Sequence, residues 1–588
     1  KLPPMKHLLT LILIVTGILV SAQNILPAGF AKGEKELMPL YLENLEANGI
    51  TTPPTTIPRS PAEWEEMQAV VISWKSYNSI LAEIVRHARE ECKVVIMCSD
   101  VNSVKNYLDL VKVDYSSNVD FVVAQANSVW IRDYGANPIY LNRVDSLAFV
   151  DWIYNRPRPL DNKMPDVEGT YFNLPVYATT SQPFDLVHTG GNFMSDGMGT
   201  GFSSNLVLDE NGPNNNYGFS NHSEQEVDSI MYKYMGIDKY IKMTNLPFDA
   251  IHHIDMHMKL LDEQTLIVGK YPDNIADGPQ IEANLQYVLN NFKTRIGTPF
   301  RVIRVPMPAD KNYLYPDQGG DYRTFANALI INKSVLLPIY EMKYDTTAIK
   351  IWESAMPGYK IRGINCDGMI SASGAIHCIT KEVGVAQPLL LQHFSLDDVQ
   401  GAYPAGYPIA AHAEHKTGIN NVYLNYRIKD KDTTWTRIPM TAFNAELTDY
   451  ESAIPEQANG TVIEYYIEAT ANNGKIQYKP MTAPLGFYTF KVNNTSGSKD
   501  LTRQNLLGEI FPNPAKSITC IPVSCAEAQQ LDISIIDVFG KPVKQIFNGK
   551  QIQGESKYFF DASQLVSGNY FVKIIGEHGS EVKLVLVQ

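Results

Sequence analysis

The sequence predicts an α/β domain followed by two all-β domains, and three observations carry this prediction. Between about residues 69 and 383, apolar segments of strand length alternate with segments of helical apolar spacing. After about residue 388, apolar and polar residues alternate between Asn and Gly turns, and no amphipathic helix interrupts them. The chain of 588 residues is also too long for a single core.

Within the α/β part, strands and helices are expected at short intervals. The pattern predicts strands at 69–74, 93–97, 119–123 and 146–154, and helices at 79–90 and 103–111. No clean internal sequence repeat is visible. In the later part, strands are expected at 422–428, 461–468, 531–539 and 568–574.

The N-terminus has the pattern of a secretory signal peptide. Lys6 and His7 precede an apolar run over 8–20, and Val20-Ser21-Ala22 predicts cleavage after Ala22. No later stretch approaches the length that spans a bilayer. The expected organisation is a signal peptide at 1–22, a leader at 23–58, a catalytic-sized α/β domain at 59–388, a β-sandwich at 389–493, a linker at 494–505 and a last β domain at 506–588.

The overall charge and the cysteines exclude some classes of function. A formal net charge of -13 argues against a nucleic-acid partner, because a phosphate backbone is bound by a surplus of Lys and Arg. Six cysteines are few for an exported chain of this size, so disulfides are not its main scaffold, although Cys520 and Cys525 could pair.

One cysteine stands out, because a run of small residues, Ser371-Ala372-Ser373-Gly374-Ala375, leads into Ile376-His377-Cys378-Ile379. A loop of this kind can place the Cys378 sulfur at the edge of a packed element, facing a cavity. A lone cysteine is more often a buried core residue. His377 adds nothing to the case, since neighbours in an extended segment point to opposite faces.

Three further clusters could carry chemistry. Asp133 follows a predicted strand, where α/β sheets collect ligands, or it forms a structural ion pair with Arg132. In a strand, the run 252–257 would place His253, Asp255 and His257 on one face; zinc is an alternative there, although the run lacks the common zinc spacing. The third cluster is Tyr154-Asn155-Arg156-Pro157-Arg158-Pro159. Its stiffened arginines suit a carboxylate, or form an exposed basic turn.

Most of these residues fall into five motifs that follow one another along the chain. The motifs are Pro61-Ala62-Glu63-Trp64-Glu65, Trp130-x-Arg132-Asp133, His188-Thr189-Gly190-Gly191-Asn192, His253-x-Asp255 and Ile376-His377-Cys378-Ile379-Thr380. Over about residues 59–383 the chain resembles the Porphyromonas-type peptidylarginine deiminase family, which also contains agmatine deiminases. The resemblance implies the five-bladed α/β propeller (pentein) fold of guanidino-group-modifying enzymes.

The resemblance also implies the roles of the site residues. Cys378 would be the nucleophile, His253 the acid and base, and Asp133 and Asp255 the carboxylates that bind the guanidinium. The substrate-binding set would be Asp133, Asp255, Arg156, Arg158, Trp130 and Asn192. The implied reaction converts peptide arginine, preferably at a C-terminus, into citrulline and ammonia, with no metal or organic cofactor.

Two branches of the family differ beside Tyr154. Agmatine deiminases carry an Asn-Ala-Trp-Gly-like run there, whereas this chain has the two arginines of the peptidyl branch, which would repel a cationic amine. Ile379-Thr380 looks more like the agmatine branch, and Ala250 stands where the peptidyl branch has tyrosine. An agmatine deiminase therefore stays an alternative, as does a non-catalytic surface-binding protein.

The last domain resembles a type IX secretion sorting domain. The resemblance rests on Phe511-Pro512-Asn513-Pro514-Ala515 and on the closing Gly568-Asn569-Tyr570-Phe571-Val572. The preceding sandwich resembles the immunoglobulin-like domain of the same enzymes. Together these features imply a secreted or cell-surface protein whose partners are arginine-containing peptides and the secretion machinery.

Overall fold

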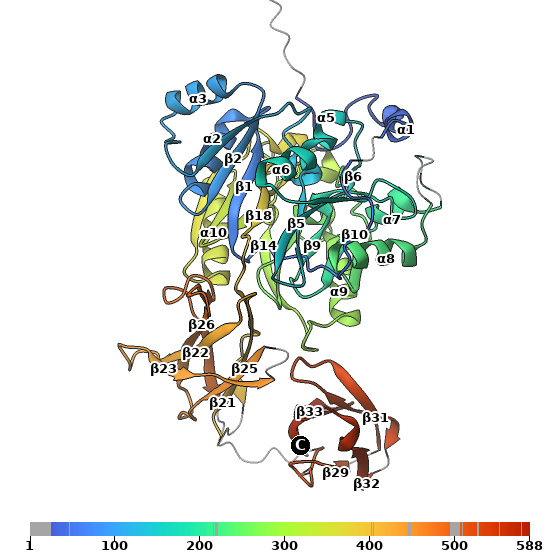
Figure 1. Ribbon diagram of the computed structural model, residues 1–588, viewed down its shortest axis with the longest axis vertical. Helices are drawn as coiled ribbons and strands as arrows, with labels where there is room; N and C mark the ends of the chain where they lie inside the picture. The colour runs from blue at the N-terminus through green and yellow to red at the C-terminus, as the bar shows by residue number, and fades with distance from the viewer. Residues whose placement is uncertain are drawn as a thin grey trace, which may run out of the picture.

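The computed structural model describes residues 25–45, 48–213, 215, 217, 221–400, 403, 405–444, 448–493, 506–508, 510–525, 528–551, 553–577 and 579–588 (Figure 1). The signal peptide expected at 1–22 and the linker expected at 494–505 lie outside these residues. Within the described part of the chain, no helix is long and apolar enough to cross a membrane.

Five small sheets of three or four strands make up the α/β part. Their strands, in spatial order, are β18 (Lys381–Gly384), β1 (Met67–Ser73), β2 (Lys93–Cys98) and β3 (Val119–Val123); β4 (Asn137–Leu141), β5 (Ser146–Asp151) and β7 (Val176–Ala178); β11 (Lys239–Met243), β10 (Thr200–Ser204) and β9 (Met194–Ser195); β12 (Met258–Leu260), β13 (Thr265–Lys270) and β14 (Arg301–Pro306); and β15 (Leu329–Ile331), β16 (Ser334–Ile339) and β17 (Lys360–Asn365). A further pair joins β6 (Ile153–Tyr154) to β8 (Val187–His188).

All five sheets follow one plan. A central strand (β1, β5, β10, β13 or β16) pairs antiparallel with one neighbour and parallel with the other. The parallel pair is joined by a helical crossover, because parallel strands cannot be linked by a tight turn. The structure thus repeats a supersecondary unit that is not visible as a sequence repeat. The arrangement of the five sheets as propeller blades stays a prediction.

The helices of this part are α2 (Asn78–Ala88), α3 (Val101–Leu110), α4 (Ile131–Tyr134), α5 (Pro159–Asn162), α6 (Met164–Phe172), α7 (Leu206–Asn211), α8 (Glu224–Met235), α9 (Gly278–Asn291) and α10 (Met342–Ala355). In the leader, α1 (Met38–Glu43) buries Met38 and Leu42 against Ile153 and Val187. The helix predicted at 79–90 is α2, and it buries the predicted apolar face: Ile80, Leu81, Ile84, Val85 and Ala88. The strand predicted at 146–154 is interrupted at Trp152, so it forms β5 and β6.

The next domain has two sheets around one apolar core. One sheet contains β19 (Leu390–Gln392), β21 (Tyr407–Glu414), β25 (Asp449–Ile454) and β24 (Thr441–Asn444). The other contains β20 (Val399–Gln400), β28 (Tyr488–Asn493), β26 (Val462–Ala471), β22 (Ile419–Ile428) and β23 (Thr436–Pro439), with β27 (Ile476–Lys479) beside β26. Its immunoglobulin-like character stays a prediction.

The last domain also has two sheets and its own core. In one, β29 (Ile518–Cys525) pairs with β32 (Gly554–Asp561); the other contains β31 (Pro542–Gln551), β30 (Gln529–Ile536), β33 (Gly568–Gly576) and β34 (Gly579–Val587). Cys520 and Cys525 are both free thiols on β29, so the suggested pairing is wrong. Five residues of strand separate them by about 16 Å, and a disulfide needs Cα atoms within about 7 Å.

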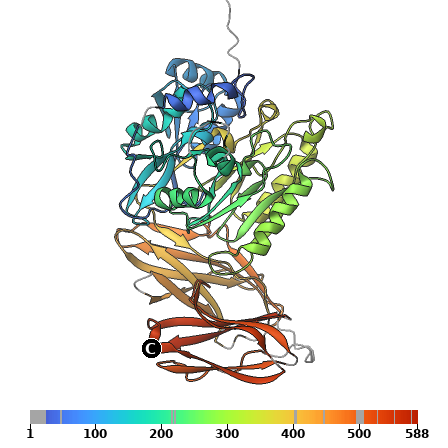
Figure 2. The same cartoon turned by 90° about the vertical axis from the view of Figure 1, so that its right-hand side faces the viewer.

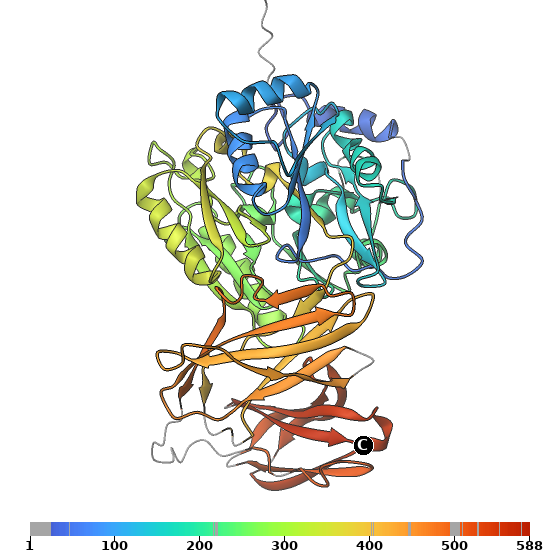
Figure 3. The same cartoon turned by 60° about the vertical axis from the view of Figure 1, so that its left-hand side comes forward.

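The sandwich lies between the α/β part and the last domain (Figures 2 and 3). Several polar contacts join it to the α/β part, and three of them show the range of burial. Lys479 Nζ lies 2.7 Å from Glu263 Oε1 with both side chains buried. Arg301 Nη1 donates to Ser395 Oγ at 2.6 Å, and Arg143 Nε lies 2.7 Å from Glu414 Oε2.

Candidate active site

Cys378 lies in a single 3-10 turn, His377–Ile379, directly before β18. Its side chain is buried, and its sulfur lies 3.2 Å from Asn327 Nδ2 and 3.7 Å from Asp255 Oδ2. The small-residue run ahead of it has a steric reason. The Trp130 ring occupies the space that a side chain at Gly374 would need. Cys378 thus sits at the edge of the first sheet, as its sequence context predicts.

The run 252–257 is not a strand, which corrects the prediction that His253, Asp255 and His257 share a face. His253 precedes a 3-10 turn, Ile254–Met256, and its neighbour His252 has a left-handed φ of 57°. His253 and Asp255 therefore point to different partners. His253 Nε2 lies 3.4 Å from Thr189 Oγ1, and Asp255 faces His377 and Cys378. Both ring nitrogens of His257 are buried without a hydrogen-bond partner among the described residues.

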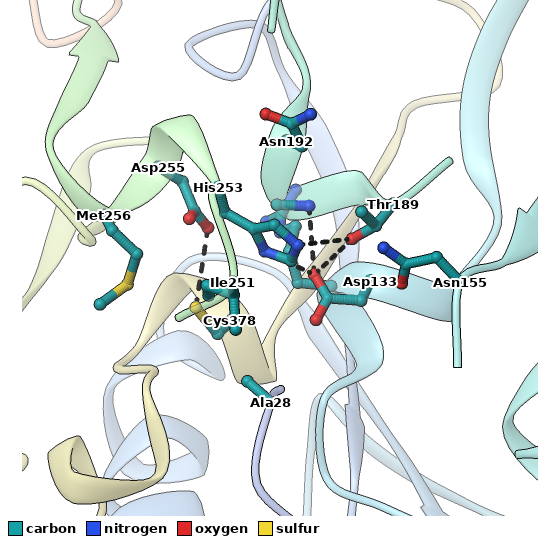
Figure 4. A network of polar contacts seen from close by, with 12 residues as sticks. Ala28, Asp133, Asn155, Thr189, Asn192, Ile251, His253, Asp255, Met256 and Cys378 are labelled. Atoms are coloured by element: carbon teal, nitrogen blue, oxygen red, sulfur yellow. Dashed lines mark hydrogen bonds and ion pairs between the residues drawn. The ribbon is translucent and has the colours of Figure 1, made fainter. Parts of the chain in front are cut away.

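Asp133 points into the same site from α4 (Figure 4). Its Oδ1 accepts hydrogen bonds from Thr189 Oγ1 at 2.9 Å and from Gly191 N at 3.2 Å, and it lies 3.5 Å from His253 Nδ1. The alternative of an ion pair with Arg132 is wrong. Arg132 turns away from Asp133 and pairs with Glu382 at 2.5 Å.

The glycine pair of the His188–Asn192 motif makes room for this convergence. A Cβ on Gly191 would lie 2.6 Å from His253 Nδ1 and 2.8 Å from Asp133 Oδ1. Asn192 is buried behind it. Its Oδ1 accepts from Ser204 N at 2.9 Å, while its Nδ2 has no hydrogen-bond partner among the residues described.

A chain of hydrogen bonds behind Asp255 was missed by the sequence reasoning. Asp255 Oδ2 lies 2.7 Å from His377 Nδ1, and His377 Nε2 lies 2.9 Å from Glu63 Oε2. Lys259 Nζ lies 2.6 Å from the same Glu63 oxygen. His377 therefore does serve the site, through Asp255 rather than through its neighbour Cys378. The signal was present, because Glu63 and His377 both lie in motifs that mark the family.

Burial shifts the pKa values of Cys378, His253 and Asp255. Burial raises the pKa of Cys378 well above its usual value, and the nearby carboxylates of Asp255 and Asp133 raise it further. Burial also lowers the pKa of His253. For Asp255, burial raises the pKa, but the hydrogen bond and charge of His377 outweigh it, so the pKa lies below its ordinary value.

This arrangement favours a cation as ligand. Asp255 Oδ1 is buried and has no hydrogen-bond partner among the described side chains and backbone. Two carboxylates thus flank a neutral thiol, and one keeps an unfilled acceptor. A planar guanidinium, with N–H donors along its edges, fits such a pair of carboxylates.

The predicted arginine pair is buried, so the reading of an exposed basic turn is wrong. Arg158 pairs with Glu34 of the leader, with Nε 2.7 Å from Oε1 and Nη2 2.9 Å from Oε2. The Arg156 guanidinium lies over the Phe30 ring, 4.3 Å from its centroid. Trp130 Nε1 also donates to the leader, to Leu26 O at 2.8 Å. Three of the six predicted substrate-binding residues, Arg156, Arg158 and Trp130, thus contact the leader.

Comparisons with known proteins identify the family of the chain. Residues 59–383, more than half of the chain, match the family model described as Porphyromonas-type peptidyl-arginine deiminase. A Vibrio parahaemolyticus protein named "Putative agmatine deiminase" is 24% identical over 354 residues, which cover 55% of this chain and 96% of that protein. A Legionella pneumophila protein of the same name is 25% identical over 353 residues, covering 55% of this chain and 94% of its own.

One solved structure shows the fold. It is an X-ray structure of a "putative agmatine deiminase", similar with a TM-score of 0.50 and 19% identity, covering 58% of this chain and 100% of that one. The tail has its own match: residues 509–588 fit the model of a secretion system C-terminal sorting domain, which indicates export to the cell surface or secretion. The chain thus belongs to the Porphyromonas-type peptidyl-arginine deiminase family, whose deiminases hydrolyse C–N bonds of guanidino groups.

Proposed function

We propose that this protein is an exported deiminase that converts peptide arginine, preferably at a C-terminus, into citrulline and ammonia. The observation that carries the proposal is the convergence of Cys378, His253, Asp133 and Asp255 in one buried site. The sulfur and the two carboxylates belong to three separate segments, and this arrangement suits a guanidinium whose central carbon faces the sulfur.

In the first half of the reaction, the bound guanidinium neutralises the two carboxylates that raise the pKa of Cys378. The thiol proton moves to neutral His253, and the thiolate attacks the central carbon to form a tetrahedral adduct. His253 then gives that proton to one departing NH₂ group. The C–N bond breaks, ammonia leaves, and a thiouronium remains on Cys378.

In the second half, His253 takes a proton from water, and the resulting hydroxide adds to the thiouronium carbon. The C–S bond breaks next. The departing sulfur recovers the proton from His253, the hydroxyl on the central carbon loses its proton to solvent, and the ureido group of citrulline is released. Each step uses a group of this chain, and the only reactants consumed are arginine and water.

The arginine pair favours a peptide over agmatine. Arg156 and Arg158 stand buried beside the site, where the primary amine of agmatine would add a third positive charge. A peptide ending in arginine brings a carboxylate to the same place. Agmatine deiminase stays the second candidate, because the relatives compared above carry that name and Ala250 replaces the tyrosine of the peptidyl branch.

The test is a panel of four arginine compounds: a dipeptide ending in arginine, its C-terminal amide, a peptide with internal arginine, and agmatine. We expect most citrulline from the free-acid dipeptide. Cys378→Ala should abolish turnover of every compound while the circular dichroism spectrum stays unchanged. Turnover of agmatine alone would reassign the substrate, and an active Cys378→Ala variant would refute the mechanism.

A further inference from the structure

The leader does more than precede the catalytic domain, because the backbone of residues 26–29 lies along the site. Four successive carbonyls accept hydrogen bonds from side chains of the predicted substrate-binding set. Trp130 Nε1 donates to Leu26 O at 2.8 Å. Arg158 Nη2 donates to Pro27 O and Gly29 O, both at 2.9 Å, and Arg156 Nε donates to Ala28 O at 3.2 Å.

Ala28 is the leader residue that enters the site itself. Figure 4 draws it with the polar network, on the side of Cys378 and Ile251. It is 1% exposed and belongs to the same buried cluster as Trp130 and Cys378, and its N–H donates to Ala372 O at 2.9 Å. Its backbone is thus bound on both sides, by the arginine pair and by the run that leads to Cys378.

Glu34 completes the likeness to a peptide substrate by supplying a carboxylate. Ala31 N donates to Glu34 Oε2 at 2.7 Å, which folds the leader back so that the carboxylate meets Arg158. The pKa of Glu34 is below its usual value, because the hydrogen bond and charge of Arg158 outweigh burial, which raises it. Glu34 therefore already makes with Arg158 the contact that we propose for the terminal carboxylate of a substrate.

The leader lacks the one group on which the enzyme would act. Residues 1–58 contain no arginine, and Arg59 is the first in the chain. Where a substrate would extend a guanidinium toward the two carboxylates, the leader presents the methyl group of Ala28. It can occupy the peptide groove without being converted.

We propose that residues 26–34 are an internal pseudosubstrate, which occupies the groove that takes the main chain and carboxylate of a peptide substrate, and which must be displaced before that substrate binds. This inference rests on the proposed deiminase function. Because Met38 and Leu42 anchor the leader on the same domain, the segment competes at the high effective concentration of a tethered ligand.

The first experiment weakens the leader in the full chain. Glu34→Gln removes the carboxylate from Arg158, and Glu36→Gln, an exposed change two residues further on, is the matched control. Loss of one charge-assisted contact should lower KM for the free-acid dipeptide roughly ten- to a hundredfold, with kcat unchanged. Equal KM values for the two variants would mean that the leader is a fixed part of the site, which the substrate does not displace, and would contradict the proposal.

A second readout does not need turnover. Alkylation of Cys378 by iodoacetamide, followed by peptide mapping, reports how often the leader exposes the sulfur, so it should be faster in Glu34→Gln than in Glu36→Gln. If no variant converts any arginine compound but this difference appears, the proposed deiminase function fails, and only the displacement of the leader from Cys378 is supported. If turnover is present and both KM and labelling are equal in the two variants, the pseudosubstrate fails alone.

The third experiment gives the leader the missing group. Ala28→Arg should make the segment a substrate in place, so that mass spectrometry finds citrulline at position 28. The same change combined with Cys378→Ala should keep arginine there. Unmodified arginine at position 28, in a variant that still converts the free-acid dipeptide, would show that Ala28 does not occupy the position of the reacting residue.

Discussion

Burial and two neighbouring carboxylates raise the pKa of the Cys378 thiol and so favour its protonated form. The reactivity of this thiol should therefore depend on the charge of the reagent or substrate that binds beside it. A neutral chloroacetamide should therefore react slowly at pH 7, with a rate that keeps rising as the pH rises toward the elevated pKa. The cationic chloroacetamidine neutralises the carboxylates when it binds, so it should react faster at pH 7.

The measurement is the rate of Cys378 alkylation by each reagent between pH 6 and 10. Asp255→Asn is the matched variant, because it removes one of the two charges that the cation would neutralise. There the advantage of the cationic reagent should shrink. Equal rates of the two reagents in the unaltered protein would show that the carboxylates do not control the thiol.

His377 positions Asp255 and does not touch the sulfur, so its role can be separated from catalysis. In His377→Asn, Asp255 loses the hydrogen bond and charge that hold its pKa down. The carboxylate then protonates at higher pH, and the acid limb of the kcat/KM profile should move to higher pH. Loss of one charge-assisted hydrogen bond should also lower kcat/KM roughly ten- to a hundredfold at neutral pH.

The control is His87→Asn, since the His87 ring contacts Glu83 on the same helix. That variant should keep the profile of the unaltered protein. A His377→Asn profile that drops without moving along the pH axis would assign His377 a purely structural role.

At the residue scale, motif order predicted which side chains matter but not how they connect. Cys378, His253, Asp133 and Asp255 all lie in motifs, and the structure brings them together. The link from His377 to Glu63 joins segments 314 residues apart, which no local pattern encodes. Asn327, 3.2 Å from the sulfur, lies in no motif that the sequence analysis used, and a neutral amide gives little signal on its own.

The elements that carry the site are single turns. Asp133 lies on the four-residue α4, and Asp255 and Cys378 each lie in a three-residue 3-10 turn. Such turns have no periodicity of their own and form only against the packed sheets around them. This is why the run 252–257 was predicted as a strand, while long periodic elements such as α2 were placed within about two residues of their bounds.

The turn of Asp133 is tied to the turn of Cys378 by Arg132. Its Nε donates to His377 O at 3.2 Å, and its buried guanidinium pairs with the half-buried Glu382. Glu382→Leu should lower the free energy of unfolding by about 3–5 kcal/mol, because it leaves a buried cation without a partner. Arg132→Met combined with Glu382→Leu should recover most of this loss.

In the double variant, the free energy of unfolding should recover while kcat does not. The double variant lacks the donor to His377 O, so its kcat should stay low even though its unfolding resembles that of the unaltered protein. Chemical denaturation and steady-state kinetics on the same samples measure both. A double variant with full kcat would show that Arg132 stabilises the fold without positioning the turns.

At the scale of the whole molecule, the sandwich and the tail should be separable by truncation. A chain that ends at Asn493 keeps both partners of the Lys479–Glu263 pair and the sandwich core. It should convert arginine as the full chain does, yet fail to be exported without the sorting tail. Citrulline in cell lysates and in culture medium measures the two effects.

A chain that ends at residue 388 is the contrasting truncation. It loses Lys479 and uncovers apolar residues at the junction, including Trp64, Leu261 and Met356, which line a cavity of about 590 Å³ with the sandwich. We expect it to aggregate. A soluble, active chain of this length would make the sandwich dispensable for the catalytic domain.

The pairing of β1 with β18 fixes the order in which the enzyme can become complete. Met67 of β1 pairs with Gly384 of β18. More than three hundred residues are synthesised between them, so the first sheet cannot be complete until β18 has been made. Contacts so distant in sequence form late in folding, and until then the edge of β1 is open to pairing with other chains. Cys378 lies three residues before β18. The proposed nucleophile therefore reaches the two carboxylates in the same event that protects the edge of β1, and a chain that ends before β18 has neither the complete site nor the paired edge.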